Sequence, residues 1–461
     1  MTPPTAPAGD DSSPSYGDYL AADGVGAPRF LQEQSWRSLG DGPIAAERYT
    51  SREFFELEAA RLWPRVWQMV CREEDIPAVG DALPYDIVGK SFIVLRTAPD
   101  TIRAYYNSCP HRGRKLLLTA GRLDRIHCPF HGFTWNLTGD LRSAPCRWDF
   151  KHLSDSELAL PQARVERWGG FVFLNMDPNA APLSEYLGVL PSHFERWAPE
   201  ARVKSVHVGK VIQCNWKIAQ EAFMESYHVV ATHPQILSFC ADANARYDLL
   251  SENVNRNLTA FAAPSPHVAR QTSPEQTRDG MLAMLGRGAA RVGDGEPRPV
   301  VGGLVRESFR RAYGGDWTGV SDAELLDAIV YNVFPNFSPW GGFAPSIVYR
   351  WRPNGRDVGS CLMEVMILKP LKAGEPQPSA APFRLLGENE AWSDVAELPI
   401  LGAVIDQDMG NMPYVQQGLE ASGTGQVQLA SYQESRIRHF HTRIDAYIRQ
   451  AEPAGAAVWP L

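Results

Sequence analysis

Two short segments that each pair a cysteine with a histidine constrain this chain more than any other feature. Cys109 and His111 form the first pair, Cys128 and His131 form the second, and residues 112–127 separate them. Two thiolates and two imidazoles from paired loops fit a [2Fe–2S] cluster with two Cys on one iron and two His on the other. Because imidazole donates less negative charge than thiolate, such a cluster has a higher reduction potential than an all-Cys cluster. The sequence therefore predicts a centre that accepts and passes on single electrons.

Structural zinc is the alternative for the same four residues. Its usual spacing is Cys-x2–4-Cys followed by His-x3–5-His, whereas here Cys and His alternate and only Pro110 separates the first pair. Gly113 and Gly132 follow the two pairs and suit tight loops that expose backbone N–H groups to sulfur. The pattern favours the iron–sulfur cluster over zinc.

A second candidate site lies on a predicted helix from Asn215 to Thr232. Helical spacing places Glu221, Glu225 and His228 on one face of this helix. Taken alone, a histidine or a Glu-x-x-His pair on a helix is more often a core or surface feature than a metal ligand. A chain that also carries an iron–sulfur cluster, however, is expected to hold a second centre that accepts the electrons of that cluster.

The end of this helix brings in a second histidine. Pro234 disfavours helical geometry at the residue before it, so we expect the helix to end near Thr232 and His233 to turn back towards His228. Two histidines and one carboxylate form the facial site that holds Fe(II) and leaves positions open for O₂ and substrate. A different reading makes Glu225 a surface charge paired with Lys217 or Arg246.

Composition limits the function classes. The chain has 461 residues, 44% of them hydrophobic and 21% charged, which is typical of a globular protein of two or three domains. A net charge of −8 gives no indication of a basic surface that would bind nucleic acid. Seven cysteines do not form a disulfide framework, and neither a membrane span nor a signal peptide is evident, so we expect a cytoplasmic protein.

Changes in composition and periodicity divide the chain into segments. Residues 1–27 are expected to form a flexible tail, and residues 28–44 to pack on the catalytic domain. Residues 45–165 read as a small antiparallel β domain, with three short strands between 82 and 107, and residues 166–461 as a larger catalytic domain. Residues 265–320 are expected to form a lid. Four aromatic residues suit either a pocket wall or plain core: Phe334, Phe337, Trp340 and Phe343.

Together these features resemble the large (alpha) subunit of the Rieske non-haem iron oxygenases, the aromatic-ring-hydroxylating dioxygenases with their related mono-oxygenases and demethylases. The resemblance extends from about residue 45 and rests on four motifs: Cys109-Pro-His111-Arg112-Gly113, Cys128-Pro-Phe-His131-Gly132, Asn215-Trp216-Lys217 and Glu225-Ser-Tyr-His228-x4-His233-Pro234. It implies an α+β fold, with a small antiparallel β Rieske [2Fe–2S] domain. The catalytic domain would be an antiparallel sheet surrounded by helices, of the helix-grip type.

The resemblance also implies roles for single residues. Asp408, which precedes the family-like stretch Gln416-Gln417-Gly418-Leu419, would be the third iron ligand, with Asp406 as the alternative. Glu225 would be the electron-transfer bridge to His131 of the next subunit in a homotrimer, and Asn215 would belong to the catalytic set. The position of Glu225 is often Asp in the family, and Glu occurs in the branch that oxidises quaternary ammonium compounds.

The resemblance implies a terminal oxygenase that adds one or two oxygen atoms to a small hydrophobic, aromatic molecule. The alternatives are a mono-oxygenase or demethylase for a quaternary-ammonium, methoxy or N-methyl substrate and, more distantly, a non-catalytic electron carrier. Electrons from NAD(P)H would come through a separate reductase, with or without a ferredoxin, because no Gly-rich nucleotide-binding loop follows a strand. A small beta subunit is a further possible partner.

Overall fold

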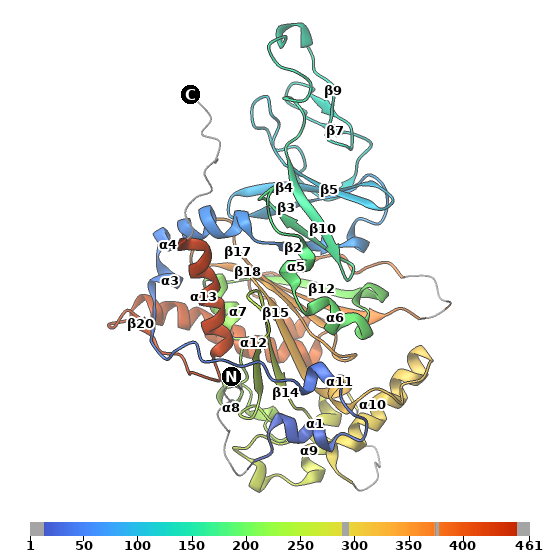
Figure 1. Cartoon of the computed structure of the whole chain (residues 1–461), viewed down its shortest axis with the longest axis vertical. Helices are drawn as coiled ribbons and strands as arrows, with labels where there is room; N and C mark the ends of the chain where they lie inside the picture. The colour runs from blue at the N-terminus through green and yellow to red at the C-terminus, as the bar shows by residue number, and fades with distance from the viewer. Residues whose placement is uncertain (1–12, 288–294, 373, 375–377, 450–461) are drawn as a thin grey trace.

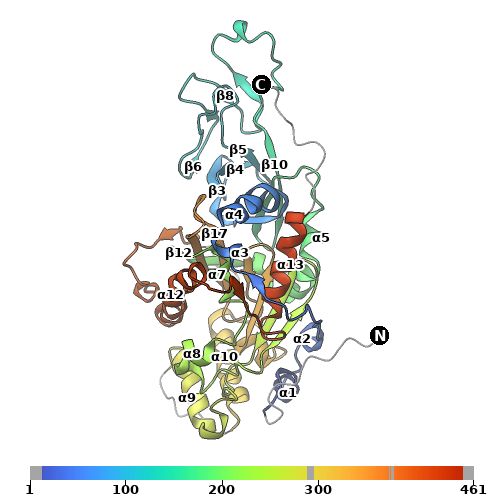
Figure 2. The ribbon, with the colours of Figure 1, turned by 90° about the vertical axis from the view of Figure 1, so that its left-hand side faces the viewer.

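The computed structural model describes residues 13–287, 295–372, 374 and 378–449. Figure 1 shows a narrow β module at one end of the long axis and a broader domain of sheet and helices below it. Figure 2, turned by 90°, shows the same arrangement. Among the described residues, no helix has the length and apolar content needed to span a bilayer.

The narrow module consists of two antiparallel sheets. The larger has the strand order β2-β11-β10-β5-β4-β3-β6 and the smaller the order β7-β8-β9. The strands are β2 (Gln68–Arg72), β3 (Asp81–Ile87), β4 (Lys90–Ala98), β5 (Thr101–Tyr106), β6 (Gly121–Arg122), β7 (Ile126–His127), β8 (Thr134–Trp135), β9 (Leu141–Ser143), β10 (Gln162–Trp168) and β11 (Phe171–Asn175). The three strands predicted between 82 and 107 are thus present as β3, β4 and β5.

The larger sheet crosses the expected domain boundary. Strand β10 contains residues 165 and 166 and pairs with both β5 and β11. Strand β11 is buried along its whole length and also pairs with β2. Although the composition changes near Trp168, the hydrogen-bond ladder continues, and the first sheet ends at Asn175.

The N-terminal segment is more ordered than expected for a tail. Residues 1–12 lie outside the described residues, but α1 (Tyr16–Ala22) begins at a Ser15 cap and buries Tyr16 and Leu20. The Tyr16 hydroxyl donates to Asp327 at 3.1 Å. Burial of these two apolar side chains explains why this part of the segment packs on the catalytic domain.

The broad domain contains an eight-stranded sheet with the order β13-β14-β15-β16-β17-β18-β12-β19, antiparallel except for the β12–β19 pair. Its strands are β12 (Arg202–Ile212), β13 (Arg246–Leu249), β14 (Val254–Thr259), β15 (Ala328–Val333), β16 (Phe337–Pro339), β17 (Ile347–Pro353), β18 (Cys361–Pro370) and β19 (Arg384–Leu385). A separate two-stranded ladder joins β1 (Ile44–Ala45) to β20 (Gln426–Val427).

Helices surround this sheet, which confirms the predicted α+β class. α7 contacts β17 and β18, α12 contacts α7 and β12, and α13 contacts β13 and β14. The helices are α2 (Arg29–Gln32), α3 (Glu47–Thr50), α4 (Arg52–Leu57), α5 (Leu183–Leu187), α6 (Leu190–Phe194), α7 (Trp216–Glu221), α8 (Val229–Thr232), α9 (Pro274–Met284), α10 (Pro297–Tyr313), α11 (Asp322–Leu326), α12 (Pro399–Glu420) and α13 (Ser435–Arg449). α9 and α10 occupy the expected lid, of which residues 288–294 lie outside the described residues.

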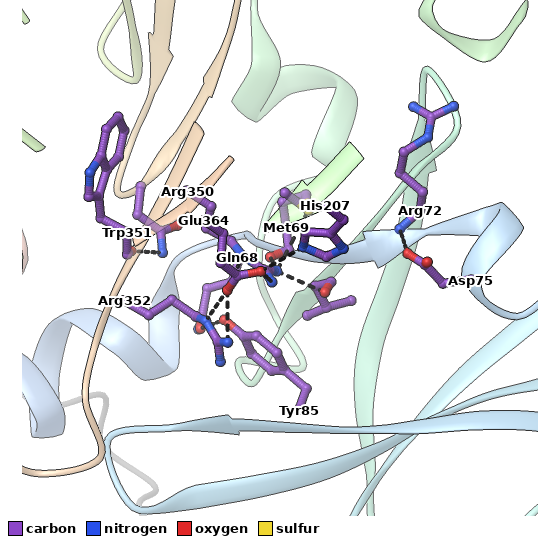
Figure 3. A network of polar contacts seen from close by, with 12 residues as sticks. Gln68, Met69, Arg72, Asp75, Tyr85, His207, Arg350, Trp351, Arg352 and Glu364 are labelled. Carbon is purple, nitrogen blue, oxygen red and sulfur yellow. Dashed lines mark hydrogen bonds and ion pairs between the residues drawn. The ribbon is translucent and has the colours of Figure 1, made fainter. Parts of the chain in front are cut away.

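A buried network of charged residues joins the two domains (Figure 3). Glu364 on β18 binds Arg350 at 2.5 Å, Arg352 at 2.8 Å and His207 at 3.0 Å. Arg350 also donates to the carbonyls of Met69 and Val70 on β2, at 2.8 Å each. These contacts attach the edge strand of the first sheet to the catalytic sheet.

Candidate functional site

The two Cys–His loops have the same backbone hydrogen bonds. The Gly113 N–H donates to the Cys109 carbonyl at 2.8 Å, and the Gly132 N–H donates to the Cys128 carbonyl at 3.0 Å. Gly113 and Gly132 have φ values of +72° and +78°, a conformation that glycine adopts without steric cost. Two loops built alike are expected where both supply ligands to one group.

The two loops bring their predicted ligands together in like pairs, the Cys109 thiol beside the Cys128 thiol and the His111 ring beside the His131 ring. Cys109 and Cys128 are buried thiols, and the rings of His111 and His131 lie 4.5 Å apart, centroid to centroid. The buried Phe133 ring stacks on His111 at 5.0 Å. Among the described residues, the buried Nδ1 atoms of both histidines have no hydrogen-bond partner. A pair of free thiols and a pair of unpartnered imidazole nitrogens, carried on two loops of the same build, fit a [2Fe–2S] cluster held by two Cys and two His.

The predicted helix from Asn215 to Thr232 is interrupted. α7 ends at Glu221 and α8 begins only at Val229, so Glu221, Glu225 and His228 do not share one helix face. Two residues distant in sequence stabilise the intervening turn. Arg436 donates to the Met224 carbonyl at 3.0 Å, and the Tyr247 hydroxyl accepts the Ser226 N–H at 3.1 Å. These bonds replace the helical ones, so the interruption leaves no buried backbone group unpaired at these positions.

Glu221 and Glu225 consequently point to different partners. Glu221 binds the Tyr49 hydroxyl and His441 Nε2, each at 2.9 Å. Glu225 binds His228 twice: its Oε1 lies 2.7 Å from His228 Nδ1, and its Oε2 accepts the His228 N–H at 3.0 Å.

Glu225 is paired with neither of the bases considered from the sequence. Lys217 Nζ binds Glu58 at 2.8 Å, and Arg246 Nε lies 3.3 Å from Asp248. The interpretation of Glu225 as a charge paired with Lys217 or Arg246 is therefore wrong.

His228, His233 and Asp408 form a compact group. Asp408 Oδ1 lies 2.8 Å from His233 Nε2 and 3.4 Å from His228 Nε2. One ligand atom from each residue lies within 4.8 Å of the other two, which is close enough to hold one metal ion. α8 ends at Thr232 and His233 has a non-helical backbone, as Pro234 predicts.

The charges of this group suit a cation. Burial alone would lower the pKa of His228, but hydrogen bonds to Asp408 and Glu225 outweigh it and raise the pKa to about 10. Burial would raise the pKa of Asp408, but the two histidines outweigh it and lower that pKa. In the metal-free protein an imidazolium thus compensates the carboxylates, and a metal ion would replace that proton.

Gln407 is a functional contact that the sequence did not reveal. Its Oε1 lies 2.8 Å from His233 Nδ1, so this nitrogen carries the hydrogen and donates. Glu225 holds Nδ1 of His228 in the same way. Both imidazoles therefore turn Nε2 towards Asp408, and hydrogen bonds of this kind fix the tautomer of metal-binding histidines.

The structure separates the two candidate aspartates. Asp406 accepts the N–H groups of Trp392 at 2.8 Å and Ser393 at 3.0 Å, away from the histidines. Asp408 lies on the buried face of α12, together with Ile405, Met409, Met412 and Gln416.

Asn215 occupies a structural position and not the expected catalytic one. Its side-chain oxygen accepts the Lys217 N–H at 3.1 Å as the N-cap of α7, and its side-chain nitrogen donates to the Val358 carbonyl at 3.0 Å. Its own N–H donates to Gln416 at 3.0 Å. With these contacts made, Asn215 positions the helix that precedes Glu225.

A cavity of about 140 Å³ adjoins the histidines and Asp408. Its wall is mostly apolar and aromatic: Ala222, Phe223, Val229, Ile236, Cys240, Phe261, Met284, Ala328, Val330, Trp340, Tyr349, Leu401 and Val404. Met284 comes from α9, so the expected lid contributes to the wall. Of the four aromatic residues considered from the sequence, Trp340 lines the cavity. Phe334 and Phe337 are buried in the hydrophobic core, and Phe343 packs against that core, half-buried.

Two family models match the chain. The ring hydroxylating alpha subunit (catalytic domain) matches residues 194–450, and the Rieske [2Fe-2S] domain matches residues 66–154. These matches confirm both the resemblance inferred from the motifs and the predicted [2Fe–2S] and iron cofactors.

Similar proteins of known activity include oxygenases of two substrate classes. The chain is 30% identical over 194 residues to the carnitine monooxygenase oxygenase subunit of Escherichia coli K12, covering 41% of this chain and 52% of that protein. It is 31% identical over 198 residues to the benzene 1,2-dioxygenase subunit alpha of Pseudomonas putida, covering 41% and 44%. The chain therefore spans about half the length of the relatives it matches.

Two solved structures are similar over nearly their whole length. A quaternary ammonium Rieske monooxygenase in complex with L-carnitine has a TM-score of 0.62 at 18% identity, covering 89% of this chain and 97% of that one. Naphthalene 1,2-dioxygenase from Rhodococcus sp. has a TM-score of 0.59 at 18% identity, covering 89% and 95%. At this level of identity the agreement shows the fold.

Proposed function

This chain belongs to the ring-hydroxylating alpha-subunit family, and from that premise we propose that it is the terminal component of a Rieske oxygenase. It would use O₂ and electrons from a separate reductase, with or without a ferredoxin, to oxygenate a small hydrophobic molecule. The observation that carries this proposal is the compact group of His228, His233 and Asp408 beside an apolar cavity.

We assign the metal ligands as follows. Cys109, His111, Cys128 and His131 would hold the [2Fe–2S] cluster, and His228, His233 and Asp408 would hold Fe(II). When bound, these groups supply one-electron transfer and activation of dioxygen. The protein orients the ligands through Gln407 and Glu225, and the apolar wall excludes water from the substrate position.

Glu225 is the proposed electron-transfer bridge between subunits. The Cys–His loops lie at the opposite end of the molecule from α8, which carries His228 at its start (Figures 1 and 2). A homotrimer would place His131 of the partner subunit against Glu225. Exposed apolar side chains at both places support such a contact: Phe130 in the loop is 52% exposed, and Tyr227 beside His228 is 53% exposed.

The cavity wall favours a mainly hydrophobic substrate. The charged residues among its lining are Glu225 and the proposed iron ligands, so no Lys or Arg of the described chain lines it. An aromatic compound fits such a wall. The proposed location is the cytoplasm, and a small beta subunit is a further proposed partner.

A quaternary-ammonium or N-methyl substrate is the second candidate. Phe223, Trp340 and Tyr349 line one cavity, and aromatic faces bind quaternary ammonium groups. Glu at position 225 is consistent with that branch of the family. A non-catalytic electron carrier would leave the cavity and its histidines without a role.

Substrate screening with a surrogate reductase tests the proposal. Aromatic compounds and trimethylammonium compounds are supplied with NADH and O₂, product is identified by mass spectrometry, and oxygen uptake is recorded. Oxygenated product from either class supports a terminal oxygenase and separates the two candidates. Reduction of the cluster without product from any compound would favour the electron carrier.

A further inference from the structure

A patch of three polar side chains interrupts the apolar wall of the cavity. Ser226, Asn257 and Thr259 line it, and their exposed fractions are 7%, 3% and 2%. Ser226 belongs to the turn between α7 and α8, whereas Asn257 and Thr259 lie on β14. Buried polar groups of this kind normally satisfy one another completely.

The hydrogen bonds in the patch leave one hydroxyl hydrogen without an acceptor among the described residues. Asn257 Nδ2 donates to Ser226 Oγ and to Thr259 Oγ1, at 3.3 Å each. The two hydroxyl oxygens lie 2.6 Å apart, so one hydroxyl donates to the other. The accepting hydroxyl keeps its own hydrogen, and among the described residues no acceptor for it is found.

Arg436 fixes the direction of these bonds. Its Nη1 donates to Asn257 Oδ1, so the amide nitrogen of Asn257 must face the two hydroxyls. Arg436 is fully buried and bound to the Asn255 side chain and the Met224 carbonyl, with no carboxylate paired to it in the described chain. Burial lowers the pKa of Arg436 to about 9, which leaves it charged at neutral pH.

Hydrogen bonds therefore run from Arg436 through Asn257 to the two hydroxyls. The last hydrogen in this series, which carries a partial positive charge, belongs to a hydroxyl that lines the cavity. Each bond polarises the next, which strengthens the terminal O–H as a donor. The negatively charged residues of the cavity, Glu225 and Asp408, hydrogen-bond to His228 and His233 and not to either hydroxyl. A ligand oxygen that takes the place of a cavity water would supply that acceptor.

We propose that the Ser226–Thr259 hydroxyl pair is a specificity-determining subsite that donates a hydrogen bond to an oxygen of the substrate. This inference rests on the proposed oxygenase function and narrows its substrate class. The substrate is a small, mainly apolar molecule that carries a carbonyl or carboxylate oxygen. Its apolar part lies against the aromatic wall beside the histidines.

Equilibrium binding to the anaerobic, metal-loaded protein tests this subsite without turnover. Calorimetry compares acetophenone, benzoate and isopropylbenzene, three phenyl compounds of similar shape. We expect acetophenone or benzoate to bind roughly tenfold more tightly than isopropylbenzene, the worth of one hydrogen bond to a buried donor. A preference for acetophenone identifies a carbonyl substrate, and a preference for benzoate identifies a carboxylate.

Variants assign the preference to the patch. Thr259→Val or Ser226→Ala, whichever removes the accepting hydroxyl, should bring the affinity ratio close to one while isopropylbenzene binding is retained. Thr277→Val is the matched control, because Thr277 is 1% exposed on α9 and does not line this cavity. Equal or tighter binding of isopropylbenzene to the wild type, no binding of any probe, or an unchanged ratio in both cavity variants would overturn the proposal. Failure of the oxygenase function would appear separately, as absence of iron from the protein.

Discussion

The Nε2 atom of His233 lies 2.8 Å from Oδ1 of Asp408, although 175 positions separate the two residues in the chain. His228 Nε2 approaches the same oxygen at 3.4 Å. Gln407 and Glu225 hold the opposite nitrogens of the two rings. The two imidazole nitrogens and the carboxylate oxygen that we propose as metal ligands therefore point towards one position before any metal binds.

The first prediction concerns Asp408, the proposed third iron ligand. Asp408→Asn removes the anionic ligand and should lower the iron content from about three to about two atoms per chain, with the visible spectrum of the cluster retained. Asp406→Asn is the matched control: it loses hydrogen bonds to Trp392 and Ser393, so it should keep all the iron and lose about 1 kcal/mol of stability. Equal iron content in the two variants would exclude Asp408 as a ligand.

The second prediction concerns Glu225. Glu225→Gln keeps a side chain of the same size but removes the charge that faces His228 Nδ1. We expect both metal centres to load normally and the reoxidation of the reduced cluster by O₂ and substrate to slow at least a hundredfold in stopped-flow experiments. Glu221→Gln, whose carboxylate binds Tyr49 and His441 instead, should reoxidise at close to the normal rate. Normal single-turnover product from Glu225→Gln would reject the bridging role.

The third prediction tests electron transfer between subunits. Cys109→Ser chains lack a proposed cluster ligand and His233→Ala chains lack a proposed iron ligand, so each variant alone should be inactive. Mixed oligomers, formed by co-expression with two affinity tags, place an intact cluster of one chain against an intact iron site of another. Recovery of a measurable fraction of activity is expected. Mixed oligomers as inactive as the parents would indicate transfer within one chain.

The fourth prediction concerns the domain junction in Figure 3. Burial would raise the pKa of Glu364, but Arg350 and Arg352 outweigh it and hold that pKa well below 4.5. A lowered carboxyl pKa stabilises the folded state above pH 4.5, and this contribution is lost as the pH falls below that value. Glu364→Gln should therefore lower the stability at pH 7 by about 3 kcal/mol, because it leaves Arg350 buried without a counterion.

Thermal unfolding at pH 7 and at pH 4 measures this effect. The difference between wild type and Glu364→Gln should shrink at the lower pH. Glu307→Gln, which removes an exposed carboxylate paired with Arg310 and Arg311, should leave the unfolding temperature close to that of the wild type. Equal unfolding temperatures for wild type and Glu364→Gln at pH 7 would contradict the prediction.

Much of the proposed site could be predicted because most of its candidate ligands lie in short local motifs. The Cys–x–His and Cys–x–x–His loops, and the turn that Pro234 imposes at His233, depend on neighbouring residues. The choice between Asp406 and Asp408 was also open to sequence reasoning. Ile405, Asp408, Met412 and Gln416 recur at helical spacing and mark the buried face of α12, to which Asp406 does not belong.

Other features depend on residues far away in the chain. The helix break after Glu221 depends on Arg436 and Tyr247, which bind the Met224 carbonyl and the Ser226 N–H. No local sequence pattern predicts either contact. Gln407 approaches His233 only after α12 has packed against α7. The order of the N-terminal segment likewise depends on Asp327, which accepts a hydrogen bond from Tyr16.

Metal analysis combined with EPR of the anaerobically purified protein tests the central claim most directly, that one chain holds a mixed Cys/His iron–sulfur cluster and a separate iron. We predict about three irons and two sulfides per chain, with a Rieske-type signal that appears on reduction. A colourless protein that contains zinc, or one whose iron content does not exceed that of the cluster, would contradict the account.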